Sequence, residues 1–145
     1  MISATTKTLT IVGKDIHDIS SFYAEINRVF MAEENWKLGE SLDALDDMLR
    51  GGYGAIRGYP GAKLVWKDIG LARSSLGLEA TRTYLRAKLE RPDLYNVDWI
   101  NDQLAALEAG TGQTYFEIIL EIIAGHQSIE LVSDELSPIM PAHQP

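Results

Sequence analysis

Apolar and polar positions alternate in short segments near the start, the middle and the end of the chain. The last segment sets Ile129 and Leu131 against Glu130. Such alternation, with β-branched residues and turn residues on either side, is typical of strands. The segments predicted as strands are residues 7–12, 63–69 and 128–133.

Between these segments the apolar residues recur at intervals of three and four. Phe22, Ile26 and Phe30 follow this spacing, which indicates an amphipathic helix, and Ser20 or Ser21 is expected to cap its start. The same spacing predicts further helices over residues 40–50, 78–90, 93–109 and 114–124. Strands separated by helices predict an α/β fold, here a three-stranded parallel sheet flanked by helices and joined by right-handed crossovers.

The chain has the length of a single domain. Its 145 residues are predicted to form one domain over residues 1–137, followed by a flexible tail at 138–145. The absence of cysteine excludes disulfides and thiolate metal sites and favours a reducing compartment. The start of the chain lacks the features of a signal peptide, and no apolar run approaches the ~20 residues that cross a bilayer. We therefore expect a cytoplasmic protein, monomeric when free, with no membrane contact.

The formal net charge of −8 narrows the range of partners. Phosphate backbones repel such a surface, so direct binding to nucleic acid is disfavoured. An acidic surface can attract a basic protein, although the same charge also serves solubility alone. Charge by itself leaves both interpretations open.

The acidic residues concentrate around the predicted helix over residues 40–50. Asp43 and Asp47 stand one turn apart on the face opposite Leu45 and Met48. Like charges at this spacing repel by a few tenths of a kcal/mol, and acids near the end of a helix are disfavoured by its dipole. Three interpretations remain: a face that only meets solvent, a site for a hard divalent cation, or a surface that binds a cationic protein.

The phrase Gly39-Glu40-Ser41-Leu42-Asp43-Ala44-Leu45-Asp46-Asp47 resembles the signature of the barstar family, in which Gly-Glu-Asn-Leu-Asp-Ala-Leu opens the inhibitory helix. Further segments resemble that family's strands and its first helix, so that the resemblance covers residues 8–69 and 114–133. It implies a barstar-like α/β fold, with residues 71–111 as an inserted helical pair.

The resemblance also implies a function. Barstar covers the catalytic cleft of a ribonuclease with its acidic helix and the following loop, and its carboxylates occupy the sites of substrate phosphates. This chain is then not an enzyme, needs no cofactor, and has a basic ribonuclease or nuclease toxin as its partner. The partner-binding residues implied are Glu40, Ser41, Asp43, Asp46, Asp47, Arg50, Gly51, Gly52, Tyr53 and Glu121, with Glu117 as the alternative to Glu121. Asp46 departs from the family, which has an aromatic residue there.

Two other functions stay open. One is a barstar-fold module with a non-nuclease partner, and the other is a hydrolase that uses the acidic helix with a metal ion.

The three histidines are scattered and are expected at surface or capping positions, whereas Trp66 and Trp99 are expected in the core. A basic patch on the predicted helix over 78–90 is either a solubilising face or a second interaction surface; it comprises Arg82, Arg86, Lys88 and Arg91.

Overall fold

A computed structural model describes residues 6–134, and its sheet confirms the predicted parallel arrangement. The strands are β1 (Lys7–Val12), β2 (Ala62–Lys67) and β3 (Ile129–Ser133). They lie side by side in the order β1-β2-β3, all parallel. Lys7 is opposite Ala62, which in turn is opposite Ile129. The α/β fold predicted from the sequence is therefore correct.

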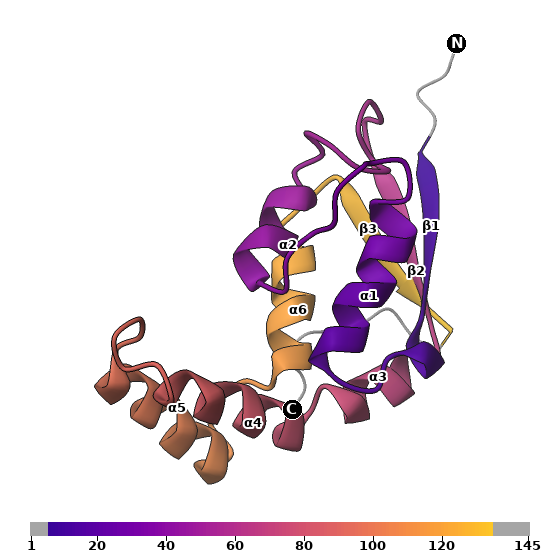
Figure 1. Cartoon of the computed structure of the whole chain (residues 1–145). Coiled ribbons are helices and arrows are strands. Elements are labelled where there is room, and N and C mark those ends of the chain that lie inside the picture. The colour runs from indigo at the N-terminus through magenta and orange to yellow at the C-terminus, as the bar shows by residue number, and fades with distance from the viewer. Residues whose placement is uncertain (1–5, 135–145) are drawn as a thin grey trace.

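The order of the strands decides where the helices lie. A right-handed crossover from each strand to the next, always in the same direction across the sheet, places both connections on one face. Figure 1 shows α1, α2 and α6 together on that side. The helices are α1 (Ile19–Phe30), α2 (Leu42–Met48), α3 (Ile69–Ser75), α4 (Leu78–Leu89), α5 (Val97–Ala109) and α6 (Tyr115–Ala124), and a 3-10 turn, η1 (Gly13–Asp15), follows β1.

The two faces of the sheet differ accordingly. Leu64 and Trp66 point into the core and are buried, whereas their neighbours Lys63 and Lys67 are exposed on the other face. Trp66 stacks on Phe22 of α1 with ring centroids 6.2 Å apart. Burial of such large aromatic side chains supplies much of the free energy that holds helices onto a sheet.

Helices α4 and α5 form an antiparallel pair that extends away from the sheet (Figure 1). The pair has a small cluster of its own, built on Leu85, Ile100 and Leu107. Thr81 joins it to the main body, because its hydroxyl donates to the carbonyl of Gly77 at 2.7 Å and accepts from the backbone N–H of Tyr115 at 2.7 Å. The predicted helical pair is thus present; that it is an insertion remains a prediction.

Several predicted boundaries were wrong. Asp18, not Ser20 or Ser21, caps α1: its carboxylate accepts from the N–H of Ser21 at 2.8 Å, and the Ser21 hydroxyl accepts from the N–H of Asp18 at 2.9 Å. The helix predicted over residues 40–50 spans only Leu42–Met48, and the one predicted from 93 begins at Val97.

One helix was missed and one tryptophan was misplaced. The strand predicted to reach residue 69 ends at Lys67, because Asp68 turns the chain in a left-handed conformation (φ 52°) and α3 begins at Ile69. Trp99 is 53% exposed on α5 rather than part of the core.

The predicted tail at 138–145 lies outside the described residues. None of the helices within residues 6–134 is long and apolar enough to span a membrane.

Candidate functional site

Helix α2 is held in place by a capping residue at its start and by the burial of its apolar face. The Ser41 hydroxyl accepts from the N–H of Ala44 at 2.9 Å and caps the helix, as Ser does at helix starts. Leu45 and Met48 are buried in the main core, and α2 packs beside α6 (Figure 1). The opposite face of α2 therefore points outward, with the predicted Asp43 and Asp47 exposed on it.

Asp46 has a different environment from its two neighbours. Its Oδ1 lies 2.7 Å from Nε2 of His126, which follows α6, and its Oδ2 accepts from Arg50 at 3.2 Å. The hydrogen bond with His126, supported by Arg50, holds the pKa of the Asp46 carboxyl below its usual value. This carboxylate ties α2 to the end of α6, and nothing in the sequence pointed to a contact between residues 80 positions apart.

Asp47 is linked to an aromatic pair. The Tyr53 hydroxyl donates to Oδ2 of Asp47 at 3.1 Å, and the Tyr53 ring lies 4.9 Å from that of Trp36. Partial burial, together with the Asp47 carboxylate, raises the pKa of Tyr53. Trp36 is 44% exposed and was absent from the predicted site. The sequence signal that could have found it is a tryptophan placed three residues before Gly39, where the acidic phrase begins.

The loop after α2 is shaped by glycine and by hydrogen bonds to the preceding segments. Gly51 and Gly54 have φ values of 90° and 81°, which other residues seldom adopt. The N–H of Gly54 donates to Oε2 of Glu34 at 2.8 Å, and the N–H of Ala55 donates to the carbonyl of Phe30 at 2.8 Å. The predicted loop residues Gly51, Gly52 and Tyr53 are thereby brought beside Asp47.

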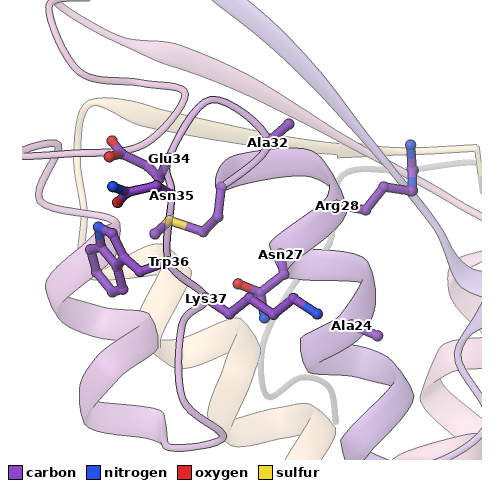
Figure 2. A pocket seen from close by; sticks show the side chains of 9 residues that line it. Ala24, Asn27, Arg28, Ala32, Glu34, Asn35, Trp36 and Lys37 are labelled. Atoms are coloured by element: carbon purple, nitrogen blue, oxygen red, sulfur yellow. The ribbon is translucent and has the colours of Figure 1, made fainter.

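The segment between α1 and α2 borders a shallow groove of about 540 Å³ (Figure 2). Asn27 anchors this segment: its Oδ1 accepts from the N–H of Leu38 at 2.7 Å, and its Nδ2 donates to the carbonyl of Leu38 at 3.2 Å. The same segment carries Trp36, so Asn27 helps to fix the position of the indole. Charges of both signs line this groove, since Glu34 lies there with Arg28 and Lys37, and Arg28 is already paired with Glu25 at 2.6 Å.

The remaining predicted residues lie around this centre. Glu40 precedes α2 and accepts from the Ser20 hydroxyl at 3.0 Å. Glu117 caps α6 by accepting from the N–H of Thr114 at 2.9 Å, so its carboxylate has a structural role. Glu121 is exposed one turn further along α6, where Gln113 donates to it at 3.4 Å.

Two residues of the predicted basic patch, Arg82 and Lys88, are engaged by other side chains of the described residues, and Arg91 lies after α4, which ends at Leu89. Arg82 pairs with Glu79 at 2.6 Å and with Glu108 at 2.5 Å, and the Lys88 ammonium lies 4.4 Å from the centre of the Tyr84 ring. Within residues 6–134, no group of three or more His, Cys, Asp or Glu side chains is arranged to hold a metal ion. What the site offers is a row of exposed carboxylates beside an aromatic pair.

Comparison with known families shows what the chain is similar to. The model of the family described as Barstar (barnase inhibitor) matches residues 6–91, more than half of the chain. The matched region holds β1, α1, α2, β2, α3 and α4, and therefore the whole loop after α2. It ends before α5, so the likeness seen at residues 114–133 rests on the sequence resemblance alone. No curated protein matches the chain.

Proposed function

Because this chain belongs to the barstar family, we propose that it inhibits a ribonuclease by covering the active site with α2 and the loop that follows it. Members of this family are inhibitors rather than enzymes. The proposed contact surface consists of Asp43, Asp47, the loop over residues 51–53 and, on α6, Glu121.

The observation that carries the proposal is the contrast among the three aspartates of α2. Asp46 is bound by His126 and Arg50. Within residues 6–134, the ion pairs of the structure leave Asp43 and Asp47 without a cation. Two exposed like charges one turn apart lower the stability of the free protein. They make a favourable interaction only when a cationic partner binds.

A ribonuclease cleft supplies such a partner. It concentrates Arg, Lys and His side chains to hold the phosphates of RNA, and carboxylates form strong charge-assisted hydrogen bonds with these groups. The net charge of −8 would speed the encounter with a basic enzyme. We propose that the target is a nuclease toxin. The chain would bind this toxin in the cytoplasm and so protect the cell.

The aromatic pair would add a second kind of contact. Tyr and Trp are the side chains that most often anchor protein interfaces, and Trp36 and Tyr53 lie against each other next to Asp47. We assign Asp46 and Arg50 to holding α2 in place rather than to direct contact, because they already bind each other.

A second candidate function is a barstar-fold module with a basic partner that is not a nuclease. It is favoured by the departures from the family pattern, above all by Asp46, which stands where the family has an aromatic residue. The acidic surface would be the same, and only the chemistry of the captured protein separates the two functions.

The test is a pull-down from the lysate and culture medium of the source organism. The baits are the wild-type protein, the Asp43→Ala, Asp47→Ala variant, and a control with the same loss of charge, Asp98→Ala, Glu130→Ala, whose residues are exposed away from α2. We expect wild type and control to retain a basic ribonuclease that the Asp43, Asp47 variant loses. A basic partner without nuclease activity would favour the second candidate. Equal capture by all three baits would contradict the proposed surface.

A further inference from the structure

Two loop segments, one before α2 and one after it, lie against each other and carry the aromatic pair. Trp36 belongs to the first segment and Tyr53 to the second, and their ring centroids are 4.9 Å apart. Both residues lie outside the helix, which spans Leu42–Met48. The position of the pair therefore depends on the contacts that join the two segments.

The carboxylate of Glu34 makes one of these contacts. Its Oε2 accepts from the N–H of Gly54 at 2.8 Å. This bond lies close to the rings along the chain, since Gly54 directly follows Tyr53 and Glu34 stands two residues before Trp36. Figure 2 shows Glu34 and Trp36 projecting from the same side of their segment. The bond thus joins the two segments at the level of the aromatic pair.

The loop after α2 needs such a bond because its sequence leaves the backbone wide freedom. Glycine occupies positions 51, 52 and 54, and glycine loses more conformational entropy on ordering than any other residue. A backbone N–H forms a stronger hydrogen bond with a carboxylate than with a neutral acceptor. Glu34 is half-buried, and within residues 6–134 it takes part in none of the ion pairs. Its carboxylate therefore serves the loop rather than a cation of the chain.

We propose that Glu34 is a positioning residue of the contact surface, which acts through the N–H of Gly54 to hold Tyr53 against Trp36 before a partner binds. The inference rests on the proposed function for what the surface binds, whereas the positioning is a property of the free protein. Side chains that are already fixed do not have to be ordered on binding, and this raises affinity without adding a contact. Glu34 therefore contributes to binding without touching the ribonuclease.

The positioning is tested in the free protein by hydrogen exchange of backbone amides, measured by NMR. Glu34→Ala should speed the exchange of the Gly54 N–H about tenfold, as for loss of one charge-assisted hydrogen bond. The N–H of Leu38, which donates to Asn27 at 2.7 Å, should keep its rate. Glu34→Gln loses the same charge but retains an acceptor oxygen, so it should protect Gly54 nearly as wild type does. An unchanged Gly54 rate in Glu34→Ala, or equal acceleration at Leu38, would overturn the proposal.

The contribution to inhibition is tested with the captured ribonuclease. Glu34→Ala should raise Kd about tenfold, because the two rings must then be ordered on binding. Glu34→Gln and Glu33→Ala, an exposed neighbour with the same loss of charge, should raise Kd by less than about threefold. In a Trp36→Ala, Tyr53→Ala background, Glu34→Ala should lose most of its effect, because the rings through which it acts are gone. An undiminished effect in that background would show that Glu34 touches the partner itself and would overturn the proposal.

The two experiments separate this inference from the proposed function. If the Gly54 N–H loses protection in Glu34→Ala while the Asp43→Ala, Asp47→Ala variant still inhibits, the positioning stands and the proposed function fails. If Gly54 keeps its protection in Glu34→Ala while the Asp43→Ala, Asp47→Ala variant no longer inhibits, the proposed function stands and the positioning fails.

Discussion

Removal of the Asp47 carboxylate is the sharpest test of the inhibitory surface. In Asp47→Ala the free protein loses one hydrogen bond from Tyr53, a cost of about 1 kcal/mol. It also loses the repulsion from Asp43, about 0.2–0.5 kcal/mol, and an unfavourable anion in the last turn of α2, about 0.3–1 kcal/mol. These opposing contributions nearly cancel, so the free energy of unfolding should change by less than about 1 kcal/mol in either direction.

The effect on binding should be much larger. Truncating one partner of a hydrogen-bonded charge pair buried in an interface costs about 2–5 kcal/mol, a range informed by the barnase–barstar complex itself and therefore not independent of this family. Even its lower end corresponds to an increase in Kd of about 30-fold. The assay is a titration of RNA cleavage by the captured ribonuclease, with urea denaturation of each variant in parallel.

Tyr53→Phe is the matched control, because it removes the same hydrogen bond and keeps both the ring and the carboxylate. We expect Tyr53→Phe to raise Kd by less than about tenfold, as for loss of one hydrogen bond of about 1 kcal/mol. If both variants weaken binding equally, Asp47 acts only by orienting the tyrosine. If Asp47→Ala unfolds the protein or inhibits as wild type does, its assignment as a phosphate mimic is wrong.

Three further predictions concern the framework that holds this surface. Asp46→Asn should lower the free energy of unfolding by about 1 kcal/mol near neutral pH; because the folded pKa of Asp46 is lowered, this difference should be present above the ordinary pKa of Asp and vanish in urea titrations as the pH falls through the lowered pKa. Glu25→Ala should cost about 2–3 kcal/mol in the same assay, since it leaves the N–H of Val12, which donates to Glu25 at 2.8 Å, without its acceptor, and an unchanged midpoint would contradict this. Gly54→Ala should lower the melting temperature more than Gly58→Ala, because both have positive φ but only the Cβ at Gly54 would come within 3.0 Å of a backbone carbonyl; equal effects would refute the close approach.

The acidic surface could be predicted because its pattern is local. The spacing of Asp43 and Asp47 places them on one face of any helix, and Leu45 and Met48 necessarily bury the other face. The extent of the helix was less accessible: Ser41 competes as a cap, so Glu40 lies outside the helix that was predicted to contain it. Caps and turns depend on a few hydrogen bonds that alternative residues can make equally well.

The roles of the individual side chains could not be predicted from the sequence in the same way. Asp46 and Asp47 are adjacent in the sequence and equally acidic, yet one is bound by His126 and the other faces outward. Likewise Trp99 has the spacing of a core residue but is exposed, because the α4–α5 pair extends away from the sheet and no further layer within residues 6–134 covers it. In each case the role or the exposure of the side chain depends on whether a residue from a distant segment of the chain packs against it.

The sequence by itself determined the order of the strands and of every helix except α3, the parallel sheet, and the acidic face of α2, since each follows from periodicity along a short segment and from the handedness of crossovers. Only the tertiary structure decided which carboxylates are free to meet a partner, that Trp36 packs on Tyr53, and that Glu34 binds the loop after α2. The physical reason is that periodicity fixes the direction of a side chain relative to its own element. The neighbours of that side chain depend on how separate elements pack together.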